Sequence, residues 1–181
     1  KANRIDTDYF QPKYEKILQQ ISHHNPDSLE KHFDILRSKS FAYSDAGEIG
    51  VIKTKQLSKQ FINSEVEDRV KEEIVKREKL PVVADLDVVF ASMGVGSLGK
   101  TNIFYGFESP GQKYTIDSTL RIFRAKTNQI LPEVLAVYLN SWLGQELIYK
   151  YVVGSSGIIS IYEDYLKQFP VPLISESIQQ K

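Results

Sequence analysis

The stretch FASMGVGSLGKTNIFYG, residues 90–106, constrains the fold more than any other part of this 181-residue chain. The apolar run LDVVF, residues 86–90, leads into it and predicts a buried β-strand that ends at the glycines. Glycines permit positive φ angles and close approach of two backbones, and the following NIFYGF, residues 102–107, is rich in β-forming residues. The sequence therefore predicts a strand, a glycine loop and a second strand.

The glycine loop also satisfies two nucleotide-binding patterns. Residues 94–101 match G-x-x-x-x-G-K-[ST], the phosphate-binding loop of nucleotide hydrolases, and their three glycines match the dinucleotide-binding pattern G-x-G-x-x-G. Both kinds of site need a helix directly after the loop, because the N-terminal end of that helix binds the phosphates. The next residues, TNIFYGFESPG, predict a strand and a turn instead of a helix. We therefore favour a hairpin, with a P-loop nucleotide-binding protein using residues 94–101 as the alternative.

Hydrophobic periodicity in the rest of the chain predicts an α+β fold. Apolar residues at helical spacing predict amphipathic helices over residues 7–21 and 132–151, each with a proline in its first turn. The charged residues 65–79 predict an exposed helix, because opposite charges stand three or four residues apart. Further strands are expected over residues 32–37, 48–54 and 114–123, a short helix over 162–168, and the start of another helix after residue 174. These elements predict a twisted, largely antiparallel sheet with packed helices and helical terminal segments.

The predicted helix over residues 132–151 carries an aromatic stripe. Tyr138, Trp142 and Tyr149 follow its apolar face, and we expect them in the core of the protein and not in a platform for stacking bases.

Composition is that of an ordinary globular chain. Apolar residues make up 41% and charged residues 25%, which is enough for one core. The chain has no cysteine, which excludes disulfides and thiolate metal sites and favours a cytoplasmic protein. No apolar run approaches the length of a membrane span, and the opening KANRIDTDYF is too charged for a secretion signal. We expect no membrane association, and a chain cut from a longer protein.

The charges are balanced in number but uneven in distribution. The formal net charge is zero, which argues against a nonspecific binder of polyanions. Residues 98–126 nevertheless have a positive bias: Lys100, Lys113, Arg121, Arg124 and Lys126 are opposed only by Glu108 and Asp117. Arg121 and Arg124 flank the apolar Ile122 and Phe123, and we expect one of the two arginines to form a structural ion pair.

Motifs that carry catalysis are missing from the sequence. There is no two-proline motif of amino-methyltransferases, no acid-x-Lys element of restriction nucleases and no G-x-S-x-G nucleophile elbow. His23, His24 and His32 lack the spacing of a zinc site, and we expect them to be solvated or to cap helices. We therefore predict no catalysis by this chain, no metal and no cofactor.

Five segments appear in an order that resembles a known family. They are LDVVFASMGVGSLGK, STLRIFR, PEVLAVYLNSWLGQ, GSSG and LKQFPVPL, and they lie between about residue 48 and residue 174. The ordered set resembles the target recognition domains of type I restriction–modification specificity subunits. The preceding RIDTDYFQPKY resembles the entry segment of such domains, including those fused to adenine methyltransferases.

The resemblance implies a module that reads a short duplex DNA sequence. It implies partners that do the chemistry: a DNA methyltransferase (modification) subunit that methylates adenine, and a translocating restriction subunit. It divides the chain into an entry helix segment at residues 1–26, a target recognition domain at 27–173, and the start of a connecting helix at 174–181. Since a full specificity subunit has two such domains, we expect either half of a subunit, with a second recognition domain, or the end of a methyltransferase fusion.

Candidate DNA contacts follow from the need for cations on phosphates and polar groups at base edges. They are Lys53, Lys55, Ser92, Gly94, Gly96, Ser97, Lys100, Thr101, Asn102, Ser155 and Ser156. Two simpler explanations stay open, because Lys53 and Lys55 also suit solvent-facing strand positions and the two serines suit a plain connector. A protein-interaction domain, in which amphipathic helices dock a partner and the hairpin is only structural, is a third hypothesis.

Overall fold

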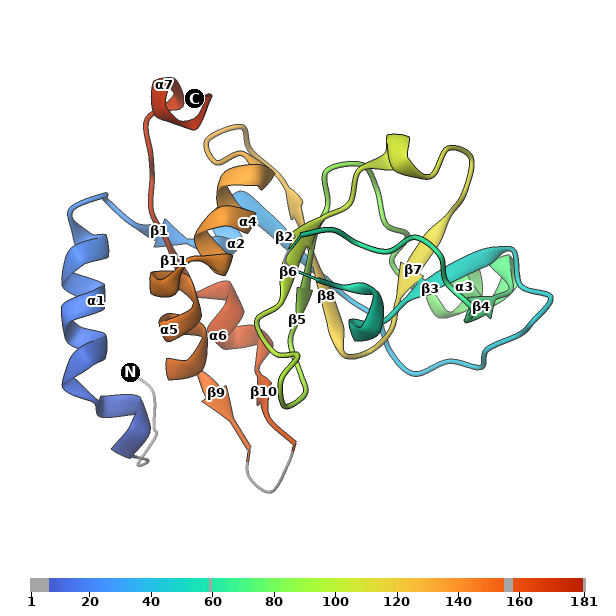
Figure 1. Ribbon diagram of the computed structural model, residues 1–181, viewed down its shortest axis with the longest axis horizontal. Coiled ribbons are helices and arrows are strands. Elements are labelled where there is room, and N and C mark those ends of the chain that lie inside the picture. The colour runs from blue at the N-terminus through green and yellow to red at the C-terminus, as the bar shows by residue number, and fades with distance from the viewer. Residues whose placement is uncertain (1–6, 59, 155–157, 181) are drawn as a thin grey trace.

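The computed structural model describes residues 7–58, 60–154 and 158–180. A larger sheet occupies the middle of the molecule. In Figure 1 the principal helices pack on one side of it, and a smaller sheet with one helix lies on the other side. The α+β fold with mostly antiparallel strands is therefore confirmed.

The larger sheet is antiparallel and runs in the order β2-β8-β5-β6. Its strands are β2 (Phe33–Arg37), β5 (Val88–Ala91), β6 (Thr101–Ile103) and β8 (Leu120–Ala125). The predicted hairpin around the glycine loop is confirmed, because β5 pairs directly with β6. Strand β5 begins two residues later than predicted because Leu86 has a left-handed backbone with φ of 63°.

The smaller sheet contains a strand from a segment that was predicted to be helical. It consists of β3 (Ile49–Ile52) between β4 (Arg69–Val70) and β7 (Tyr114–Ile116), with β3 and β7 parallel. Only α3 (Glu72–Glu78) of the predicted 65–79 helix is helical, because the buried Val70 pairs with β3.

The predicted strand over residues 114–123 is divided between the two sheets. The carboxylate of Asp117 accepts hydrogen bonds from the backbone N–H and the hydroxyl of Thr119, at 2.9 and 2.6 Å. This Asx turn separates β7 from β8, so that one apolar run supplies a strand to each sheet.

The helical side contains α1 (Pro12–Ser22), α4 (Pro132–Asn140), α5 (Trp142–Lys150) and α6 (Glu163–Lys167). The predicted 132–151 helix is broken at Ser141, which is extended and whose hydroxyl accepts a hydrogen bond from the Gly144 N–H. A Cβ at Gly144 would lie 2.1 Å from the Tyr138 carbonyl oxygen, so the sharp joint depends on this glycine.

The break changes which aromatic residues are buried. Tyr138 is buried, as predicted, but Trp142 is 66% exposed and Tyr149 is 49% exposed. The aromatic stripe was predicted for one continuous helix, but α5 starts in a new direction after Ser141. The prediction that Trp142 and Tyr149 lie in the core is therefore wrong.

Short elements connect the layers. They are η1 (Thr7–Phe10), β1 (Asp27–Ser28), α2 (Leu29–His32), η2 (Thr54–Gln56), η3 (Gly106–Glu108), β9 (Val152–Val153), β10 (Ser160–Ile161), β11 (Pro170–Val171) and α7 (Glu176–Gln179). Strand β1 pairs with β11, and β9 with β10, both antiparallel.

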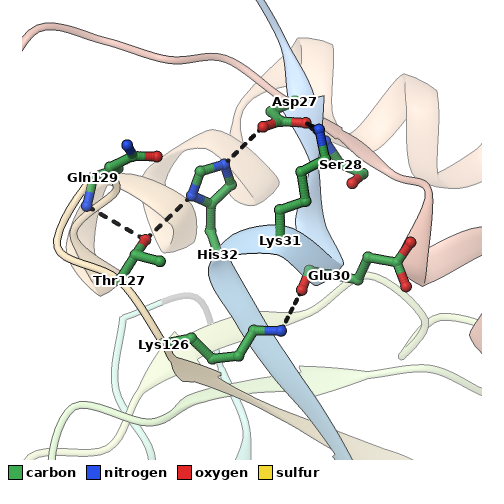
Figure 2. A network of polar contacts seen from close by, with 8 residues as sticks. All are labelled: Asp27, Ser28, Glu30, Lys31, His32, Lys126, Thr127 and Gln129. Atoms are coloured by element: carbon green, nitrogen blue, oxygen red, sulfur yellow. Dashed lines mark hydrogen bonds and ion pairs between the residues drawn. The ribbon is translucent and has the colours of Figure 1, made fainter.

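His32 forms a buried polar contact that ties the start of this domain to the end of β8. Figure 2 shows its ring between Asp27 and Thr127: Nε2 lies 3.3 Å from the Asp27 carboxylate and Nδ1 lies 3.2 Å from the Thr127 hydroxyl. The side chain is 3% exposed, so the expectation of a solvated or capping residue is wrong for His32. The Thr127 contact meets hydrogen-bond geometry, whereas Nε2 is near Asp27 without forming a hydrogen bond.

Candidate nucleic-acid interface

The glycine loop between β5 and β6 satisfies its own backbone. Gly94, Gly96 and Gly99 have φ of 107°, 74° and 88°, the conformations that favour glycine. The N–H groups of residues 97, 98, 99 and 100 donate to carbonyls of residues 91, 94 and 97. These donors therefore point into the loop and not toward a bound phosphate.

The structure overturns the nucleotide-binding alternative for residues 94–101. The residues after Lys100 form strand β6, antiparallel to β5, in place of the helix that both nucleotide motifs require. Since the N–H groups of Gly94 and of residues 97–100 already donate to carbonyls, the match to the two motifs is one of letters alone.

Strand β10 fixes the position of the glycine loop. The Gly94 N–H donates to the Ile159 carbonyl at 3.0 Å, the Ile161 N–H donates to the Ser92 carbonyl at 3.0 Å, and Met93 forms a bridge with Ser160. In Figure 1 the loop lies beside β10 at the lower edge of the molecule. Candidates Ser155 and Ser156 lie outside the described residues, in the connection between β9 and β10.

Polar side chains at the base of the loop are used internally. The buried Ser92 hydroxyl donates to the Thr119 carbonyl, and the buried Thr101 hydroxyl donates to the Gly99 carbonyl. The Asn102 amide donates to the Ser58 carbonyl at 3.0 Å, and its oxygen accepts from the Ile103 N–H. These three candidates therefore position the hairpin.

The tip of the loop presents the other candidates to solvent. Gly96 and Val95 are exposed, while Ser97 and Lys100 are partly exposed. Within the described residues, no carboxylate lies at salt-bridge distance from the Lys100 ammonium. A Cβ at Gly96 would meet nothing within 4 Å, so the backbone at the tip is open to close approach.

Lys53 and Lys55 lie in a cluster of ion pairs. The Lys53 ammonium is 2.9 Å from Asp68 and stands over the Tyr43 ring, and Lys55 is 2.9 Å from Glu67. The hydrogen bond to Asp68 raises the pKa of Lys53 above its usual value. Both lysines would have to exchange a carboxylate for a phosphate in order to contact DNA.

Carboxylates from other parts of the sequence form ion pairs with most of the basic residues in the segment 98–126. Arg124 donates to both carboxylate oxygens of the buried Asp87, at 2.9 and 2.7 Å, and is the structural ion pair expected of one of the two arginines. Lys113 lies 3.2 Å from Glu72 and Lys126 lies 3.5 Å from Asp34. Lys100 and Arg121 are left without such a partner in the part of the chain that the structure describes.

Sequence analysis missed a second basic region that only the fold assembles. A cavity of about 380 Å³ is lined by Arg37, Ser38, Lys39, Glu78, Lys79, Leu80 and Arg121. Arg37 at the end of β2 stands opposite Arg121 at the start of β8. No sequence signal joins these residues, because their positions span 84 places in the chain (121 − 37 = 84).

Groups that would suggest other kinds of site are not seen in the described ranges. No three histidine, aspartate or glutamate side chains gather there in a way that could hold a metal ion. No helix among the same residues is both long enough and apolar enough to cross a membrane.

Comparison of the whole chain with known proteins finds matches of structure but not of sequence. No family model and no curated protein matches. A type I restriction–modification S subunit from M. genitalium superposes with a TM-score of 0.56 at 12% identity, over 86% of this chain and 35% of that one. The HsdS subunit from Thermoanaerobacter tengcongensis gives 0.55 at 15% identity, over 92% and 41%.

A third structure, a chain of a type I restriction–modification complex, gives a TM-score of 0.62 at 13% identity, over 93% of this chain and 42% of that one. This protein thus spans less than half the length of the chains it matches. It has the fold of type I restriction–modification specificity subunits, over a stretch that fits one target recognition domain.

Proposed function

We propose that this chain is a sequence-specific duplex DNA recognition module without catalysis of its own. The observation that carries the proposal is the fold it shares with type I specificity subunits over most of its length. The glycine hairpin supports the same function, because backbone hydrogen bonds hold the loop in place and its open tip can approach base edges closely.

The proposed reading surface is the end of the larger sheet at which the glycine loop joins β5 to β6. Gly94, Gly96 and Ser97 would bring backbone and a hydroxyl to the base edges, and Lys100 would contact a phosphate. Ser92, Thr101 and Asn102 would keep the hairpin in position, since their polar atoms already bond within the domain. Ser155 and Ser156, which lie outside the described residues, are retained as proposed contacts.

Lys53 and Lys55 are proposed as weaker contacts. Each is already ion-paired with a carboxylate. Its contribution to the free energy of DNA binding would therefore be only the difference between the ion pair with phosphate and the ion pair with carboxylate.

The proposed partners are a methyltransferase (modification) subunit and a restriction subunit, which would supply the chemistry at the site that this domain reads. Residues 27–173 would form the recognition domain, with β1 and β11 pairing at its base. The flanking segments 1–26 and 174–181 would connect it to a second recognition domain or to a fused methyltransferase. The setting we propose is the cytoplasm.

Selection from random duplexes tests the proposal. The chain is incubated at low salt with a pool of random duplex DNA, and the bound fraction is sequenced, for the wild type and for Lys100→Ala. We expect a short sequence to be enriched and its binding to be weakened by the substitution, with Lys16→Ala on the exposed face of α1 as the matched control. Absence of any enriched sequence from the wild-type pool would refute DNA readout.

A further inference from the structure

The cavity at the end of β2 concentrates basic groups with little acidic compensation. Of the described lining residues, Arg37, Lys39, Lys79 and Arg121 are basic and Glu78 is acidic. Glu78 is shared between Lys39 at 2.8 Å and Arg77, which lies outside the lining, at 2.9 Å. This leaves Arg37, Lys79 and Arg121 in excess.

Other carboxylates compensate this excess only in part. Glu163 of α6 approaches Arg37 no closer than 3.9 Å and is shared with Lys167 at 3.0 Å. For Lys79, no carboxylate in the described ranges lies at salt-bridge distance. Arg37, Lys79 and Arg121 therefore differ from Lys53, Lys113 and Arg124, which each have a closely bound carboxylate.

Arg37 and Arg121 are directly opposite each other on neighbouring antiparallel strands. Like charges directly opposite each other on neighbouring strands destabilise a sheet, because the two side chains repel each other. Burial lowers the pKa of the Arg121 guanidinium; the charge of Glu163 opposes this shift, and the charge of Arg37 adds to it. An anion between the two arginines would relieve both effects.

The guanidinium of Arg121 is only partly satisfied. Its Nη1 donates to the carbonyls of Ser118 and Leu120, at 3.0 and 2.7 Å, which holds the group in place. Its buried Nε has no partner among the described atoms. Arg121 lines the cavity, and a guanidinium held in place is suited to phosphate, whose oxygens accept several N–H bonds at once.

The cavity and the glycine loop lie at the same end of the strands of the larger sheet, near its two opposite edge strands. One row of paired residues runs across this sheet from Arg37 through Arg121 and Phe90 to Thr101, the first residue after Lys100. Three strand spacings separate its ends, which is about 14 Å. This span is similar to the width of the DNA major groove, about 12 Å.

We infer that the cavity lined by Arg37, Lys79 and Arg121 binds a phosphodiester group of the duplex backbone, next to the groove that the glycine loop enters. The inference rests on the proposed DNA-reading function and adds to it a phosphate site that fixes the position of the module on the duplex. Such a contact contributes affinity and register but no base preference.

Glutamine substitutions test this site. Arg37, which is 71% exposed at its side chain, and the exposed Lys79 can each be changed to glutamine with little effect on folding. Lys16→Gln is the matched control, because it removes the same charge from an exposed position on α1. Affinity of the 181-residue chain is measured by fluorescence anisotropy over a range of salt, against the selected duplex and a scrambled duplex.

Each cavity substitution should weaken binding of both duplexes by the same factor, roughly 3- to 10-fold at 0.1 M salt. It should also reduce the slope of log K against log salt by about 1, whereas Lys16→Gln leaves the slope unchanged. An unchanged slope for both Arg37→Gln and Lys79→Gln would overturn the inference.

Free phosphate distinguishes the two sources of this ligand. Inorganic phosphate is titrated into the chain while the Nε–H resonances of its arginines are followed by NMR. Perturbation of Arg121 by phosphate, with DNA slopes unaffected by the substitutions, would mean a free-anion site and overturn the DNA assignment. If the wild type enriches no duplex, the proposed function fails as well; if it does but the slopes stay constant, only the phosphate site fails.

Discussion

Two groups of basic side chains in this protein differ in what surrounds them. Lys53, Lys55 and Arg124 each have a carboxylate within 3 Å, while Arg37, Lys79 and Arg121 line a cavity whose nearest carboxylates are shared or more distant. The two groups are indistinguishable by residue type. The difference teaches that a basic side chain is available to a polyanion only when the fold has not already supplied its counter-charge.

The Arg124–Asp87 pair should show the largest effect, on stability. Asp87→Ala leaves Arg124 without its partner and the Ala84 N–H without its acceptor, and we expect unfolding to become easier by about 3 kcal/mol. Urea denaturation measures this change. The control is Asp34→Ala, an exposed carboxylate 3.5 Å from Lys126, for which about 0.5 kcal/mol or less is expected. Equal losses would mean that Arg124 is no more structural than a surface cation.

Two matched double variants compare the contributions of the two groups of basic side chains to DNA binding. Arg37→Gln with Lys79→Gln should weaken duplex binding roughly 10- to 100-fold at 0.1 M salt, because two of the three cations proposed to bind the phosphate are lost. Lys53→Gln with Lys55→Gln removes the same charge, but from side chains that already have partners, and should weaken it less than 3-fold. Anisotropy titrations compare the two, and a larger effect of the second pair would reverse the assignment of the two groups.

The Lys53–Asp68 ion pair should make a small, pH-dependent contribution to stability. Because the pKa of Lys53 is raised in the folded state, the contribution is fully present below the unfolded value of about 10.4 and is lost as the pH rises through the folded pKa. Lys53→Gln should therefore lower stability by about 0.5 kcal/mol at pH 7, with the gap closing above pH 10.4. Urea titrations of both proteins at several pH values measure this gap, and a constant gap would exclude the ion pair as its cause.

Removing the charge of Asp68 tests whether its ion pairs with Lys53 and Lys55 limit DNA binding. Asp68→Asn keeps the shape of the side chain but frees Lys53 and weakens the restraint on Lys55, which is 3.9 Å from Asp68. If availability of the charge limits DNA binding, affinity should rise about 2-fold at low salt. A decrease would show that the ion pair itself, and not the free cation, is what the DNA complex needs.

Sequence alone predicted the elements whose signals are local. The strand–glycine loop–strand unit depends on an apolar run, positive φ angles at glycines and β-forming residues, all within residues 86–107, and it is present as predicted. Rejection of the nucleotide motifs was equally local, because it required only that no helix follow Lys100. The helix α1 follows from its proline and its apolar spacing in the same way.

Elements that depend on distant partners were predicted less well. The apolar run at residues 114–123 shows no break in its pattern, yet Asp117 turns it between two sheets. The stripe over residues 132–151 continues across Ser141, yet the backbone there is extended and Trp142 points to solvent. A pattern records which residues are apolar, but not the direction of the chain after a turn.

What the sequence by itself determined is therefore the α+β class and the glycine hairpin, because short-range backbone preferences control them. The tertiary structure alone decided which charges are free. Arg124 finds Asp87 across 37 residues and Lys113 finds Glu72 across 41, whereas Arg37 and Arg121 meet each other. Electrostatic energy depends on distance in space and not along the chain, so only the folded protein could separate cations with a closely bound carboxylate from those without one.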